Sequence, residues 1–271
     1  MKLSFSTLGS PEWTWNDILA VAKDLGYDGI ELRGLEKEIY MPRAMPFQPL
    51  QLTNTREQLR RLSLSIPCIA SACDLSNKPL QDACIQEGKE YIDLAQQLGA
   101  SYIRVMGDKT PEPTSSIDVE LVKETVSILG NYAQEHSVCV LIETNGFFSD
   151  TEKLAKLLEQ LQHPAVGALW DVHHPFRFQG ELPADTYRNL SGYIRHVHIK
   201  DSLVSSDGKL RYMIPGHGDL PLREIVGLLN FNGYTGFLSL EWVKRWDLTL
   251  EEPGIVFSHY VQFIKEILQF K

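Results

Sequence analysis

Four residues in the second half of the sequence are of the types that bind divalent metal ions. Each directly follows a short apolar run, and in chain order they are Glu143, Asp171, His198 and Glu241. If these runs are neighbouring parallel strands, their carboxyl ends bring the four side chains together. Three carboxylates in a small buried space repel one another unless a cation neutralises them. Three oxygen donors and one nitrogen suit Mn²⁺ first, then Mg²⁺, Co²⁺ or Zn²⁺.

The apolar runs alternate with longer segments of helical period. Short continuous apolar runs are typical of parallel strands buried on both faces. The predicted strands are Leu3–Ser6, Gly29–Leu32, Ser65–Ala70, Tyr102–Met106, Val138–Ile142, Val166–Trp170, Ile194–Ile199 and Phe237–Leu240. The predicted helices are Asn16–Leu25, Glu87–Leu98, Ile117–Gln134, Thr151–Leu161, Pro221–Leu229 and Ile255–Leu268. The segment Asp201–Leu220 is expected to form an extended loop.

About eight strand–helix units in a chain of 271 residues favour a closed barrel over an open sheet. The glycine-rich fingerprint of a dinucleotide-binding fold does not follow the first strand. No linker rich in Pro, Ser or Gly divides the chain. We therefore expect residues 1–271 to form a single α/β domain, a (β/α)₈ TIM barrel, with its chemistry at the carboxyl ends of the strands.

Net charge, cysteine spacing and hydropathy indicate which partners and which cellular compartment to expect. Lys and Arg number 26 and Asp and Glu number 35, which gives a net charge of −9. A protein of this charge repels phosphates, so nucleic acid is not expected as a partner. The four cysteines form no C-x-x-C pair and are expected to be reduced. No segment has the pattern of a signal peptide or a membrane span, so we expect a cytoplasmic protein without a membrane partner.

The motifs around these residues resemble the xylose isomerase-like TIM barrel superfamily. This group includes sugar-phosphate isomerases and epimerases, ketose 3-epimerases, hydroxypyruvate isomerase, inosose dehydratase and the endonucleases of AP endonuclease family 2. The resemblance runs through nearly the whole chain. The matching segments are Gly26–Arg33, Ile142–Asn145, Trp170–His174 with its D-x-x-H pattern, His196–Asp201 with its H-x-H-x-K-D pattern, Pro215–Asp219 and Leu240–Trp242.

The resemblance implies roles for the residues of these motifs. Glu143, Asp171, His198 and Glu241 would hold the metal, and His174 would face the substrate. Strand alternation is expected to turn His173 and His196 to the other side, with His196 packing in the barrel. Ketose 3-epimerases carry a glutamate and an arginine where this chain has Ser149 and Val204. The H-x-H-x-K-D pattern instead favours the inosose dehydratase and general isomerase branches.

Further substrate-binding candidates follow from position. Lys200 lies two residues after His198 and projects from the same face, where it could contact substrate or pair with an acid. Arg33 ends the second strand and could hold a carboxylate or phosphate, or form an ion pair at the rim, and the same holds for Arg104 in the fourth strand. His217 lies between two glycines in the loop after the seventh strand. Trp13, Phe147 and Trp242 could wall a sugar ring or simply pack.

The resemblance implies an isomerase or epimerase of a small sugar, keto-sugar or sugar phosphate. Glu143 and Glu241 would exchange the α-proton through a metal-bound enediolate. Loss of a β-hydroxyl group would instead make the chain a lyase similar to inosose dehydratase. A nuclease of the endonuclease IV type is disfavoured, because its zinc site uses histidines of the first half and the first histidine here is His136. The expected partner is a carbohydrate, with a homodimer possible.

Overall fold

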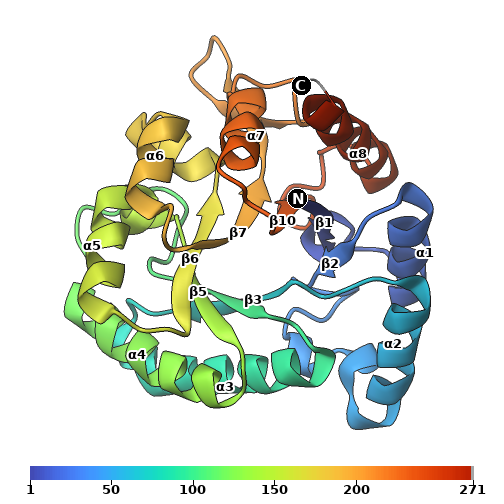
Figure 1. Cartoon of the computed structure of the whole chain (residues 1–271), viewed down its shortest axis with the longest axis horizontal. Helices are drawn as coiled ribbons and strands as arrows, with labels where there is room; N and C mark the ends of the chain where they lie inside the picture. The colour runs from blue at the N-terminus through green and yellow to red at the C-terminus, as the bar shows by residue number, and fades with distance from the viewer. Residues whose placement is uncertain (270–271) are drawn as a thin grey trace.

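Eight parallel strands in the computed structural model, which describes residues 1–269, form a nearly closed barrel (Figure 1). They follow the order β2-β1-β10-β7-β6-β5-β4-β3, and parallel bridges from Gly29 to Ser65 and from Leu32 to Ile69 join the two edges. Their bounds are β1 Lys2–Ser6, β2 Gly29–Glu31, β3 Cys68–Asp74, β4 Tyr102–Met106, β5 Cys139–Glu143, β6 Val166–Asp171, β7 Ile194–Ile199 and β10 Phe237–Leu240. The predicted (β/α)₈ fold is confirmed.

Helices connect the strands and cover the outside of the barrel (Figure 1). They are α1 Trp15–Leu25, α2 Pro49–Leu62, α3 Gln81–Leu98, α4 Val119–Glu135, α5 Thr151–Leu161, α6 Pro183–Leu190, α7 Leu222–Phe231 and α8 Pro253–Gln269. Single helical turns precede several of them: η1 Thr7–Gly9, η2 Met41–Arg43, η3 Met45–Phe47, η4 Lys78–Leu80, η5 Gly146–Ser149 and η6 Pro175–Gln179. No helix of residues 1–269 is long and apolar enough to cross a bilayer.

Local signals explain where several elements begin and end. Strands β4, β7 and β10 and helix α5 have the predicted bounds. Asp150 caps α5 by accepting a hydrogen bond from the Lys153 amide. Gly26 ends α1 with a φ of 77°, and Gly99 ends α3 with a φ of 70°, a left-handed conformation that glycine adopts without strain.

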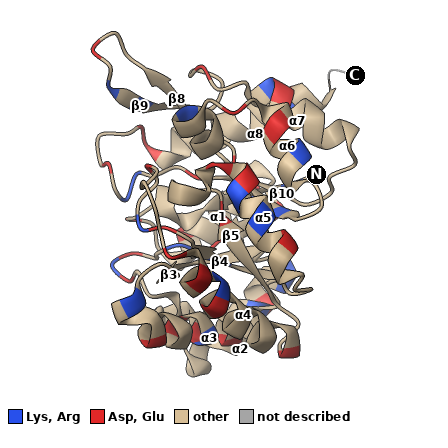
Figure 2. Ribbon diagram, turned by 90° about the vertical axis from the view of Figure 1, so that its left-hand side faces the viewer, with Lys and Arg blue, Asp and Glu red and all other residues tan. Residues whose placement is uncertain are grey.

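Three elements differ from the prediction. Helix α2 buries Thr55 and Leu59, and Leu52 and Leu62 pack partly buried against the core. Most of its other residues are polar, so its apolar stripe is narrow. Helix α6 has eight residues, too few for the period to stand out. The segment predicted as an extended loop folds into an antiparallel hairpin of β8 (Asp201–Val204) and β9 (Leu210–Met213), which projects beyond the barrel (Figure 2).

The barrel interior is separate from the apolar shell between strands and helices. Cys68, Leu141 and Leu169 form a small buried cluster of their own inside the strands, with Tyr102 and Cys139 packed against it. Glu31 and His196 are also fully buried, and both lie close to Cys68. The barrel interior therefore contains a small apolar cluster, and the polar side chains of Glu31 and His196 lie next to it.

Barrel closure depends on a close approach at Gly29. A Cβ atom there would lie 2.8 Å from the Ser65 carbonyl oxygen and 2.9 Å from the Phe237 ring. We predict that Gly29→Ala lowers the free energy of unfolding by about 1–3 kcal/mol because it forces the β2–β3 junction apart. Gly227→Ala at an exposed position of α7 is the control, since no atom lies within 4 Å of the added Cβ atom and alanine favours the helix. Equal urea midpoints for the two variants would contradict this.

Candidate active site

The four predicted metal ligands meet at the carboxyl end of the barrel. Glu143 ends β5, Asp171 ends β6, His198 lies in β7 and Glu241 follows β10, and these four strands are consecutive neighbours in the sheet. All four side chains are buried, and one ligand atom from each lies within 4.8 Å of the others. The register pairs Asp171 directly with His198. The parallel arrangement of the strands therefore brings together four residues that are far apart in the sequence.

Two atoms of this cluster have no hydrogen-bond partner. Asp171 Oδ2 and His198 Nδ1 are both buried and unpartnered among the described residues. His198 Nδ1 lies 3.9 Å from Asp171 Oδ2 and 3.6 Å from Glu241 Oε1, distances too long for a hydrogen bond. Buried polar atoms normally have partners, and those that lack one mark a functional site or an absent ion. The spacing fits donors arranged around a cation.

Glu31 holds His198 from the other side, a role that the sequence analysis missed. Its two carboxylate oxygens lie 2.8 Å from His198 Nε2 and 2.8 Å from His196 Nε2. A carboxylate on Nε2 fixes the ring so that Nδ1 faces Asp171 and Glu241, which is the usual support of a metal-binding histidine. A glutamate in the apolar strand Gly29–Leu32 was the available signal, because a buried carboxylate requires a partner.

The structure corrects the expectation for His196. Residues two apart in a strand share a face, so His196 and His198 both point into the barrel and both contact Glu31. Burial alone would lower the pKa of His198, but Glu31 and Glu241 raise it to about 9. Burial also lowers the pKa of His196, against the effect of Glu31. His173 bonds Ser202 Oγ at 3.0 Å through Nε2 and is not part of the cluster.

Lys200 supplies positive charge to the cluster. Its Nζ atom lies 2.9 Å from Asp171 Oδ2, although not aligned as a hydrogen bond, and 2.5 Å from Glu241 Oε2. Burial alone would raise the pKa of Asp171, but His174 and Lys200 hold it well below its usual range. Burial would likewise raise the pKa of Glu241, and Lys200 and His198 lower it. Both carboxylates are therefore ionised at neutral pH.

His174 and Arg104 flank Glu143. His174 Nδ1 lies 3.2 Å from the Thr144 carbonyl oxygen and 3.7 Å from Glu143 Oε1, and its Nε2 lies 3.5 Å from Lys200 Nζ. Arg104 pairs with Glu143 at 3.1 Å between Nε and Oε2, and also donates to the Ser71 carbonyl oxygen. Glu143 is thus held in place by a guanidinium on one oxygen and an imidazole near the other.

A cavity of about 430 Å³ opens above the cluster. Its lining includes the predicted Arg33, Glu143, His174, Lys200 and Glu241. The exposed His217 is not among its lining residues, since its ring stacks edge-on with His259 at 5.0 Å. The aromatic walls also differ from those considered, because Tyr212 and Trp246 line the cavity in place of Trp13, Phe147 and Trp242.

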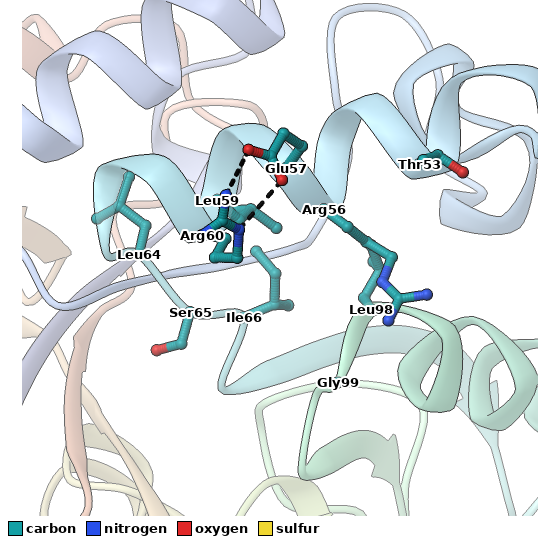
Figure 3. Close-up of a pocket in the computed structure, with 10 residues that line it drawn as sticks. All are labelled: Thr53, Arg56, Glu57, Leu59, Arg60, Leu64, Ser65, Ile66, Leu98 and Gly99. Carbon is teal, nitrogen blue, oxygen red and sulfur yellow. Dashed lines mark hydrogen bonds and ion pairs between the residues drawn. The ribbon is translucent and has the colours of Figure 1, made fainter.

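A second cavity has a volume of about 570 Å³, and Figure 3 shows the residues that line it. It lies between α2 and the segments that precede β3 and β4, where its residues include Arg56, Ser65 and Gly99. Its one carboxylate, Glu57, already accepts two hydrogen bonds from Arg60. Although larger, this cavity lies at the amino ends of the strands and gathers no cluster of ligating groups.

Comparison with known proteins agrees with this fold. The model of the family described as xylose isomerase-like TIM barrel matches residues 19–266, so the chain belongs to that family. It is 23% identical over 288 residues to fructoselysine 3-epimerase of Shigella flexneri, covering 99% of this chain and 98% of the relative. It is 24% identical to inosose dehydratase of Geobacillus thermodenitrificans, covering 79% and 81%. The chain is an enzyme of this isomerase and epimerase family.

Solved structures show the same fold. A probable 3-DHS dehydratase from Bacillus anthracis superposes with a TM-score of 0.80 at 19% identity, covering 98% of this chain and 99% of that one. A xylose isomerase-like TIM barrel protein from Mycobacterium smegmatis, in complex with magnesium, has a TM-score of 0.76 at 17% identity, covering 98% and 96%. The IOLI protein, with a binding zinc atom, has a TM-score of 0.77 at 19% identity, covering 99% and 96%.

Lys200 should be essential for stability when no metal is bound. We predict that Lys200→Met, measured in chelator, lowers the free energy of unfolding by about 3–5 kcal/mol because two buried carboxylates lose their counter-charge. Lys209→Met is the control, since its pair with Asp207 is exposed. The pKa values of Asp171 and Glu241 are lowered, so the stabilisation is present above about pH 4 and is lost on acidification. Equal unfolding midpoints for Lys200→Met and Lys209→Met in the presence of chelator would contradict this prediction.

Proposed function

We propose that this chain is a divalent-metal-dependent isomerase or epimerase of a small sugar, keto-sugar or sugar phosphate. The observation that carries the proposal is the buried cluster of Glu143, Asp171, His198 and Glu241 beneath a cavity large enough for a sugar. Relatives named as sugar epimerases and dehydratases support the same class of reaction.

The cluster fits a divalent ion on chemical grounds. One ligand atom from each of three carboxylates and one imidazole lies within 4.8 Å of the others, and Asp171 Oδ2 and His198 Nδ1 accept or donate no hydrogen bond among the described residues. Glu31 on the far nitrogen of His198 orients this ring as a ligand. We propose that these four residues hold the ion and that it is Mn²⁺, because the donor set is mainly oxygen with one nitrogen. When bound, such an ion polarises the substrate carbonyl group and acidifies the neighbouring C–H bond.

The two glutamates are placed to handle the proton. They come from β5 and β10, which are separated by β6 and β7, and both line the cavity. We assign one of them to remove the α-proton and the other to return it. Return to the opposite face of the same carbon gives an epimer, and return to the adjacent carbon gives an isomer. General acid–base catalysis of this kind contributes about 10²–10⁴-fold to a rate.

Other side chains position the reactants. His174 reaches the cavity beside Glu143, and we assign it a hydrogen bond to a substrate oxygen. Lys200 borders the same cavity and balances the charge of Asp171 and Glu241. Arg104 contacts one oxygen of Glu143 and thereby fixes the orientation of this carboxylate.

A lyase reaction of the inosose dehydratase type is the second candidate. It is favoured by the relatives named inosose dehydratase and by Ser149, which is buried and bonded to Gly146 where ketose 3-epimerases carry a glutamate. Both reactions begin with removal of the α-proton, and they diverge when a β-hydroxyl group leaves. Mass analysis of the product separates them, because only the dehydratase product has lost water.

Metal removal should abolish turnover. We expect chelator-treated protein to lose activity against a panel of ketoses, inososes and their phosphates, and Mn²⁺ to restore it, because the charge at the carbonyl oxygen is then stabilised. The measurement is product formation by NMR, with circular dichroism to confirm that the fold persists. Undiminished turnover in chelator would exclude the metal-dependent mechanism.

Glu143→Gln should remove the acid–base step and leave the fold intact. We expect the exchange of the substrate α-hydrogen with solvent deuterium to fall by about 10²–10⁴-fold, because the amide cannot accept the proton. Glu152→Gln at the exposed start of α5 is the matched control and should exchange at the normal rate. Deuterium incorporation near the normal rate in Glu143→Gln would rule out the assigned role.

A further inference from the structure

Arg33 is a buried cation that forms no ion pair within residues 1–269. It follows β2, lines the cavity and is 8% exposed. Its Nη1 atom is shielded from solvent and has no hydrogen-bond partner among residues 1–269. Burial and the neighbouring Arg104 guanidinium lower the pKa of Arg33 to about 10, so the group is still charged at neutral pH. An unpaired buried charge is costly, and proteins keep one where a ligand completes it.

The other cations of the cavity are already engaged. Lys200 contacts Asp171 and Glu241, and Arg104 contacts Glu143 and the Ser71 carbonyl oxygen. Asp247, a carboxylate that lines the same cavity, accepts hydrogen bonds from the Thr249 amide and hydroxyl groups. Neither Asp247 nor Glu241 forms an ion pair with Arg33 in the described chain. Arg33 is therefore the lining cation that is free to bind an anion.

Arg33 comes from a different part of the barrel than the four proposed metal ligands. The four proposed metal ligands come from β5, β6, β7 and β10, whereas Arg33 follows β2, which lies across the barrel from β6. Trp246 borders the cavity with its ring 5.9 Å from the Arg33 guanidinium. An aromatic ring over a guanidinium fixes its plane and leaves the edge of the fork available for a carboxylate or phosphate.

We propose that the substrate carries an anionic group, a carboxylate or a phosphate, at the end opposite its reacting carbon, and that Arg33 binds this group. The proposal rests on the proposed function, because it takes the glutamate cluster as the place of reaction. It narrows the substrate class from sugars in general to keto-sugar acids or sugar phosphates. Neutral ketohexoses would leave Arg33 unpaired and would bind more weakly.

The test uses three ligands that share one carbon skeleton and configuration. D-fructose, D-fructose 6-phosphate and D-fructuronate differ only in the terminal group, which is neutral, a phosphate or a carboxylate. Their dissociation constants are measured by calorimetry with Mn²⁺-loaded protein. We expect at least one of the two anions to bind about tenfold or more tightly than D-fructose, as charge-assisted hydrogen bonds allow. The preferred anion identifies the group.

Two variants and one control assign the preference to Arg33. Arg33→Gln should bind the anion no better than D-fructose. Arg33→Lys should retain part of the preference, since it keeps the charge and loses the fork. Arg188→Gln on α6, where the side chain is 68% exposed, should behave as wild type. Unfolding midpoints establish that each variant is folded.

The outcomes are distinct from those of the proposed function. Absence of an anion preference in the wild-type protein, including a lack of measurable anion binding, overturns the proposal. A preference that persists in Arg33→Gln overturns it as well. Both readouts are binding constants and require no turnover. If Glu143→Gln exchanged deuterium at the normal rate, the proposed reaction would be wrong. The binding preference measured for Arg33 would still hold.

Discussion

The site depends on one electrostatic constraint, the burial of three carboxylates within a few ångströms of one another. Glu143, Asp171 and Glu241 each lie on a different strand, so their approach is imposed by the closed barrel and not by local structure. Two basic side chains pair with these acids: Lys200 contacts two of the carboxylates and Arg104 contacts the third. Asp171 Oδ2 and His198 Nδ1 still lack a hydrogen bond among the described residues. A divalent ion would complete the balance, and its removal would leave Lys200 as the main counter-charge.

The interior below the cluster explains how the site keeps its geometry. Glu31 bridges His196 and His198, and its carboxylate is fully buried between them. Burial would raise the pKa of Glu31, but the two histidines hold it well below its usual range, so it accepts from both rings. Beneath this layer the interior becomes apolar, with Cys68, Leu141 and Leu169 packed together. Polar groups are therefore confined to one end, where burial strengthens each interaction.

Much of this arrangement could be predicted from the sequence, and the exceptions have physical causes. Strong periodicity marked most strands and helices, whereas α2, whose apolar stripe is narrow in a mainly polar helix, and the short α6 were not recognised. Polar residues at strand ends located the cluster, since parallel topology alone brings them together. The bridge from Glu31 to His198 joins residues far apart in the chain, and no local pattern encodes such a contact. The position of His217 depends on the β8–β9 hairpin and its packing against His259, which spacing cannot reveal.

The same barrel can support several reactions because the residues of the buried cluster and the residues around the cavity come from different segments. The strands of the second half bring together the acids and the imidazole. The loops after β2 and β10 supply Arg33 and Trp246 around the cavity, and β9 supplies Tyr212. Substitutions among the residues around the cavity change which substrate fits and leave the buried carboxylate cluster in place. An arginine held beside Trp246 and left without a carboxylate is therefore a feature of substrate choice rather than of stability, because pairing it internally would require only one acidic residue on a neighbouring loop. That this chain leaves the charge open is the physical argument for an anionic substrate.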